Sequence, residues 1–326
     1  MKVIVIDSGI DYESNKNSLI GGTDLIQPGK GIIDDNGHGS RCASIIRLYS
    51  ESMPSFYSIK ALNLNNESST ELLVKALNFT KELDIRLINL SLATQNIKSR
   101  EIIGCVIEEL YHYGKIVVAS VPNSGQIGYP ASMNHVIGVD GAIFNRSKEY
   151  WYNKYYPVQC VANRIPVLVR GYNGRIEMFG GTSKATAIMT AIIGNILEES
   201  PNISYEELEN ILQNKSLKKM WDYKQIQSLS RYIVNGVTAK YDSEEKEIEE
   251  LILKYLIEKG LQVSIEDLHK YGYQCYFAKE DFCKIIQLLE KRYGVQLSNY
   301  EGIEYRVFEN ARCLNTYFKS VNQHLL

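Results

Sequence analysis

The sequence lacks the features of a secreted, disulfide-bonded or membrane-bound chain. Its six cysteines are scattered over 326 residues without a CxxC pair, so we expect free thiols in a reducing compartment. No apolar run approaches the roughly 18 residues of a membrane span, and the short run at residues 3–6 has no signal-peptide cleavage site. The net charge of -2 shows no basic excess for nucleic-acid binding. We therefore expect a cytoplasmic chain without membrane or nucleic-acid partners, with one large domain and a small one.

Apolar strands and amphipathic helices alternate over the first two thirds of the chain. The patterns predict strands at 3–6, 56–62, 85–92 and 116–120, and helices after residue 38, over 70–81 and 101–113, and from residue 183. The strands are apolar on both faces, as in a parallel sheet covered by helices on both sides. This order predicts a three-layer α/β fold with a mostly parallel central sheet.

Polar residues stand where two of these elements end or begin. Asp7 follows the first strand, a position where α/β proteins place functional sites. An Asp there is also typical of receiver-like and haloacid-dehalogenase-like domains, but the latter require a second Asp where Gly9 stands. His38 lies between two glycines at the start of a helical pattern, where a structural role is the more common one.

Two further polar residues also stand at the start of a helix or directly after a strand. Ser183 comes after two glycines and a threonine at the start of a helix, where it would serve either as a helix cap or as a reactive group among free backbone N–H groups. Asn123 lies in a glycine-containing loop directly after the strand at 116–120, and Asn and Gly are also ordinary turn residues.

The order Asp, His, Ser along the chain is that of subtilisin, and it differs from the order in chymotrypsin and in α/β-hydrolases. The segments Asp7-Ser8-Gly9-Ile10, His38-Gly39-Ser40 and Gly181-Thr182-Ser183-Lys184-Ala185 resemble the three motifs of subtilisin-type (S8 family) serine peptidases. Ser91-Leu92 and Tyr129-Pro130-Ala131 resemble segments beside that family's substrate cleft. Residues 1 to about 225 therefore resemble a subtilisin-like domain.

The resemblance implies a role for each matched residue. Ser183 would be the nucleophile, His38 the general base and Asp7 the group that orients the imidazole. Asn123 would donate to the oxyanion, although Pro122 replaces the family's usual glycine and restricts the backbone beside it. The residues expected to contact the substrate peptide are Ser91, Leu92, Ala93, Gly125 and Tyr129. The chemistry requires no cofactor. The resemblance leaves room for a structural calcium ion, because such sites are often built from scattered oxygens, although no EF-hand loop is visible here.

The remainder of the chain predicts a separate helical domain. We assign residues 1–227 to the subtilisin-like domain, 228–243 to a linker and 244–326 to a small helical domain. The last segment weakly resembles an acyl carrier protein, but Lys279 stands near the place of the serine that would carry the prosthetic group. We expect this domain to dock a protein or peptide, and expect short-peptide hydrolysis to survive its deletion.

Together these observations predict a serine endopeptidase that acts on peptide or protein substrates. The absence of room for a prodomain before the first strand suggests a cytoplasmic processing protease for a precursor peptide. The alternative is a catalytically silent subtilisin-like module that binds peptides in the same cleft.

Overall fold

The computed structural model describes residues 1–123, 126–229 and 240–325, and their contacts divide them into two units. The larger unit contains residues 1–164, 170–175 and the described part of 180–231. The smaller unit contains residues 165–169 and 176–179 together with the described residues after 239.

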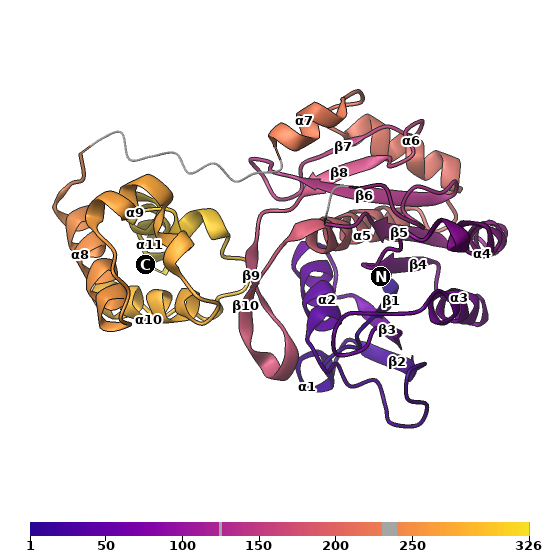
Figure 1. Ribbon diagram of the computed structural model, residues 1–326, viewed down its shortest axis with the longest axis horizontal. Coiled ribbons are helices and arrows are strands. Elements are labelled where there is room, and N and C mark those ends of the chain that lie inside the picture. The colour runs from indigo at the N-terminus through magenta and orange to yellow at the C-terminus, as the bar shows by residue number, and fades with distance from the viewer. Residues whose placement is uncertain (124–125, 230–239, 326) are drawn as a thin grey trace. The chain divides into compact units, whose positions relative to one another are not determined.

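An eight-stranded sheet forms the centre of the larger unit (Figure 1), with the order β2-β3-β1-β4-β5-β6-β8-β7. All neighbouring strands are parallel except β7, which pairs antiparallel with β8. Its strands are β1 (Lys2–Asp7), β2 (Leu19–Asp24), β3 (Ser55–Lys60), β4 (Leu87–Leu90), β5 (Ile116–Ser120), β6 (Val136–Ala142), β7 (Tyr150–Tyr152) and β8 (Cys160–Asn163).

Helices cover both faces of this sheet, because alternate residues of the buried strands point to opposite sides. On one face, Ile4 and Ile6 of β1 share a core with α3 (Thr70–Phe79) and α4 (Arg100–His112). On the other, α2 (His38–Tyr49) packs on β1 and on α5 (Gly181–Glu199), which also contacts β4, β5, β6 and β8. The helices α1 (Tyr12–Asn15), α6 (Tyr205–Lys215) and α7 (Tyr223–Ser228) complete the unit. The predicted three-layer α/β architecture is confirmed.

The smaller unit combines a two-stranded sheet with four helices. The strands are β9 (Val167–Arg170) and β10 (Ile176–Phe179), and the helices are α8 (Ser243–Glu258), α9 (Ile265–Tyr271), α10 (Asp281–Tyr293) and α11 (Ala311–Leu325). Reciprocal side-chain caps begin α8 at Asp242 and α9 at Ser264. The expected domain ranges assign β9 and β10 to residues 1–227, whereas in the structure most of their residues contribute to the smaller unit.

Among the residues that the structure describes, no helix has both the length and the apolar character needed to cross a bilayer.

Candidate active site

Asp7 and His38 meet where the carboxyl end of β1 faces the first residue of α2. His38 Nδ1 lies 2.7 Å from Asp7 Oδ1, and that carboxylate oxygen also accepts a hydrogen bond of 2.8 Å from the Ser8 backbone N–H. Asp7 is fully buried, whereas the His38 side chain is 15% exposed. The imidazole is therefore fixed from the protein interior and accessible on its other side.

Glycine at position 39 permits this close approach of helix and strand. A Cβ atom on Gly39 would lie 2.1 Å from the Gly9 carbonyl oxygen, which real Cβ atoms do not tolerate. The His38-Gly39 pair of the sequence motif therefore has a steric cause: only glycine lets α2 begin against the chain that leaves β1.

Asp34, which the sequence analysis did not single out, connects the same two elements. One of its oxygens accepts from Ser8 Oγ at 2.8 Å and from the Gly37 N–H at 2.8 Å. The other accepts from the N–H of Ser40 at 2.9 Å and from its hydroxyl at 2.5 Å. This buried carboxylate ties the end of β1 to the start of α2. Its position in the sequence, four residues before His38, was the feature that could have indicated this role.

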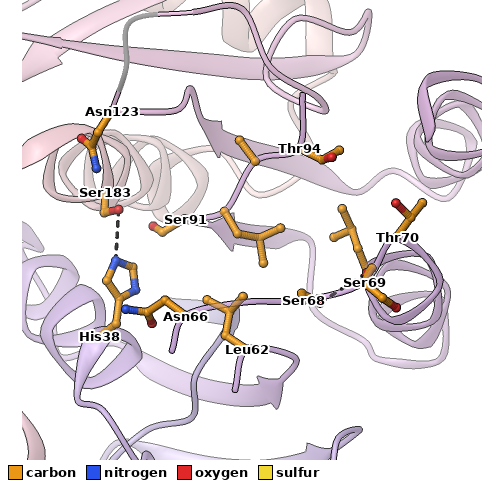
Figure 2. A pocket seen from close by; sticks show the side chains of 13 residues that line it. His38, Leu62, Asn66, Ser68, Ser69, Thr70, Ser91, Thr94, Asn123 and Ser183 are labelled. Atoms are coloured by element: carbon orange, nitrogen blue, oxygen red, sulfur yellow. Dashed lines mark hydrogen bonds between the residues drawn. The ribbon is translucent and has the colours of Figure 1, made fainter. Parts of the chain in front are cut away.

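Ser183 lies in the first turn of α5, with its Oγ 3.1 Å from His38 Nε2 (Figure 2). The cap position of this helix is Gly180, so the interpretation of Ser183 as a helix cap is wrong. The N–H groups of a first helical turn have no partner within the helix. Ser183 thus combines a hydroxyl beside an imidazole with a local excess of backbone donors.

Thr182 holds the side chain of Asn123, and the sequence analysis also missed this contact. The Asn123 Oδ1 accepts from the Thr182 N–H and hydroxyl, both at 3.1 Å. This network assigns the other amide atom as Nδ2, and Figure 2 shows the nitrogen end turned toward Ser183. Pro122 therefore does not turn Asn123 away from the site.

A cleft of about 320 Å³ opens beside Ser183 and His38 (Figure 2). Strand pairing of β4 ends at Leu90 and resumes at the Thr94–Tyr129 bridge, so residues 91–93 run along the cleft between these points. Ser91, Leu92 and Ala93 all line it, as expected. The opposite wall, which the sequence analysis missed, is formed by Leu62, Asn66, Ser68, Ser69, Thr70 and Leu73.

The other two expected substrate contacts have different outcomes. Tyr129 is not among the residues that line this cleft, and its backbone instead exchanges two hydrogen bonds with Thr94, of 2.8 and 2.9 Å. Gly125 lies outside the described residues.

The charge of Asp7 controls the protonation of His38. Burial by itself lowers the pKa of the imidazole, but the adjacent carboxylate more than offsets this, and the net pKa lies well above 6.5. Cys42 Sγ lies 3.9 Å from His38 Nδ1, and burial raises the pKa of that thiol above its usual value. Cys42 is thus a neutral, packed side chain rather than a second nucleophile.

The side chains at the site do not fit a calcium ion. In the described part of the chain, one group of His, Cys, Asp or Glu side chains brings three ligand atoms together, namely Asp7, His38 and Cys42. Calcium takes six to eight oxygen ligands, whereas this group offers one carboxylate with an imidazole and a thiol.

Comparison with known proteins identifies the family. The model of the Subtilase family (Peptidase_S8) matches residues 1–236. The chain belongs to the subtilase family. It is a serine-type endopeptidase by family, and its substrates are peptides or proteins.

Individual subtilases resemble this chain only moderately. Subtilisin DY of Bacillus licheniformis is 24% identical over 228 residues, covering 66% of this chain and 82% of the relative. An intracellular serine protease of Paenibacillus polymyxa is 25% identical over 234 residues, covering 63% and 69% respectively. A cold-adapted subtilisin-like serine proteinase of known structure shares the fold, with a TM-score of 0.56 at 17% identity over 66% of this chain and 81% of that one.

Proposed function

We propose that this subtilase cleaves peptide bonds with Ser183 as nucleophile, His38 as general base and Asp7 as the orienting carboxylate. The observation that carries the proposal is the continuous chain from Asp7 Oδ1 through the imidazole to Ser183 Oγ, with contacts of 2.7 and 3.1 Å. As Ser183 Oγ bonds to the substrate carbonyl carbon, its proton passes to His38 Nε2. Asp7 keeps the Nδ1 proton in place and stabilises the imidazolium.

The tetrahedral intermediate then collapses to an acyl-enzyme. The C–N bond breaks, and the proton on His38 goes to the leaving amine. A water molecule repeats the sequence in the second half-reaction and releases the acid product. In this proposal Asn123 Nδ2 and the backbone N–H of Ser183 donate to the oxyanion. The bonds from Thr182 to the other end of the Asn123 amide support this assignment.

The substrate lies extended along residues 91–93 in this proposal. Strand pairing on both sides of these residues stops short of them, so a peptide can add to them as a further strand. We further propose that the enzyme processes a precursor peptide or protein in the cytoplasm. The six cysteines are all free thiols, which suits a reducing compartment, and one relative is named an intracellular serine protease.

Hydrolysis of a fluorogenic peptide library tests the function directly. We expect turnover by the wild-type chain and its loss in Ser183→Ala, with Ser68→Ala in the opposite cleft wall as a matched control that retains most activity. Turnover by Ser183→Ala at the wild-type rate would place the nucleophile elsewhere. A folded wild-type chain that binds peptides but never cleaves them would support the silent module instead.

A further inference from the structure

The hydrophobic core of the smaller unit is not built from the C-terminal residues alone. Leu168 of β9 is fully buried in a cluster that otherwise consists of residues from 241 to 318, including Ile303 and Phe308. Ile176 and Met178 of β10 pack against the same cluster. The C-terminal helices therefore need a hairpin from the middle of the chain to complete their core.

Backbone hydrogen bonds attach the same hairpin to the C-terminal segment. The Leu168 N–H donates to the Ile303 carbonyl, and the Gly302 N–H donates to the Leu168 carbonyl, both at 2.9 Å. The Tyr305 N–H donates to the Pro166 carbonyl at 2.9 Å, and Val167 pairs antiparallel with Glu304. Residues 302–305 thus bond to the backbone of β9 around one isolated bridge, which is a specific attachment rather than a loose apolar contact.

The hairpin leads directly into the active site along the chain. Strand β10 ends at Phe179, and Ser183 follows four residues later. At the base of the hairpin, the Gly181 N–H donates to the Arg164 carbonyl at 3.0 Å. Gly181 has a φ of +80°, and a Cβ there would lie 2.9 Å from Asn123 Oδ1. A shift of β10 would consequently move the segment that carries both Ser183 and the Thr182 contacts to Asn123.

We propose that the folded C-terminal unit positions Ser183 through strand β10, so that peptidase activity depends on the integrity of that unit. The coupling runs along the chain: the C-terminal core holds β9 and β10, and β10 continues into the three residues before the nucleophile. Deleting residues 240–326 would expose Leu168, Ile176 and Met178 and remove the backbone partners of β9 at residues 302–305. The truncated chain therefore loses short-peptide hydrolysis, which reverses the outcome expected from the sequence alone.

The two tryptophans give a signal from the larger unit alone. Trp151 and Trp221 both lie in the larger unit, so tryptophan fluorescence reports that unit, while far-ultraviolet circular dichroism includes the helices of both. The full-length chain is titrated with urea, and each sample is tested for both signals and for the rate of labelling by a fluorophosphonate. This inference rests on Ser183 as the proposed nucleophile, and labelling without urea tests that point independently.

Every result of this titration bears on the proposal. The proposal is supported if labelling is lost in a circular-dichroism transition during which tryptophan fluorescence stays native. It is also supported if all three signals change in one coincident transition. Labelling that persists after the C-terminal helices have unfolded, and falls only with tryptophan fluorescence, overturns it.

A pair of core substitutions tests the same coupling without denaturant. Leu168→Ala truncates a buried side chain in the smaller unit, and Leu208→Ala makes the same change in the larger unit, in α6. Because small misplacements of reacting groups cost about a hundredfold in rate, we expect Leu168→Ala to lower kcat roughly ten- to a hundredfold with KM nearly unchanged. Leu208→Ala should retain wild-type kcat below its unfolding temperature. Equal kcat for Leu168→Ala and wild type would contradict the proposal.

Discussion

At the scale of single residues, Asp34 connects the end of the strand that carries Asp7 to the start of the helix that carries His38. It accepts hydrogen bonds from residues on both the strand end and the helix start, so its charge compensates several buried donors. The neighbouring Asp35 forms an ion pair with Lys60 and is 49% exposed. Asp34 therefore makes more hydrogen bonds to buried groups than its neighbour Asp35.

Asp34→Asn should destabilise the fold and slow catalysis together. The amide replaces one accepting oxygen by a donor that faces buried donors, which costs about 2 to 3 kcal/mol. We expect a fall in the free energy of unfolding of that size and a loss in kcat/KM of roughly tenfold or more. Asp35→Asn is the matched control: it removes only a half-exposed charge that faces Lys60, so both losses should be smaller than for Asp34→Asn. Wild-type values for Asp34→Asn in urea unfolding and peptide hydrolysis would remove Asp34 from this role.

The pH profile should report the raised pKa of His38. Only the neutral imidazole accepts the Ser183 proton, so a pKa well above 6.5 keeps the free enzyme inactive until the pH passes that higher value. We expect the acid limb of kcat/KM to have its midpoint above 6.5. Asp7→Asn removes the raising charge and leaves burial, so its residual activity should titrate at lower pH. A wild-type midpoint below 6.5 would contradict the electrostatic account.

Asn123→Ala should lower kcat far more than it raises KM, because the oxyanion exists only in the transition state. The expected loss is about a hundred- to a thousandfold, a figure taken from the same type of donor in subtilisin rather than obtained from this structure. Thr182→Val removes only the hydroxyl contact to Asn123 and keeps the N–H contact, so it should cost less, about tenfold. An unchanged kcat for Asn123→Ala on both an ester and an amide would exclude the proposed donor.

At the scale of elements, the start of α2 is the most constrained junction. Gly39→Ala would force its methyl group into the Gly9 carbonyl and push the helix from β1. We expect a loss of about 1 to 3 kcal/mol in stability and a marked fall in fluorophosphonate labelling. Gly104→Ala in α4 meets no atom within 4 Å and should gain about 0.5 to 1 kcal/mol with labelling unchanged. Similar stability and labelling in both variants would show that the junction is not tightly packed.

Continuous apolar runs made β1, β3, β4 and β5 predictable from the sequence. The run Ile116–Ser120 is β5 to the residue, and the predicted helix over 70–81 corresponds to α3 and the short 3-10 helix that follows it. The strands β2 and β6 to β10 were not predicted. Two glycines interrupt each of β2 and β6, and the others have only three or four residues. Short strands acquire their conformation from pairing partners, and local periodicity does not identify those partners.

At the scale of the whole molecule, the chain passes repeatedly between its two units. The pairing of Val167 with Glu304 joins segments that lie far apart in the sequence, and the local sequence pattern does not predict it. For the same reason the sequence predicted the positions of the polar side chains of the site. It did not predict the contacts that Thr182 and Asp34 make beside them. Supporting contacts depend on tertiary distance, which the motif spacing does not contain.

The measurement that most directly tests the central claim is the mass-spectrometric mapping of a fluorophosphonate adduct on the full-length chain. We predict one modified residue, Ser183, because its Oγ lies 3.1 Å from His38 Nε2 at the cleft. Labelling should disappear in both Ser183→Ala and His38→Ala. An adduct on another serine at a comparable rate, or an undiminished rate in His38→Ala, would contradict the account.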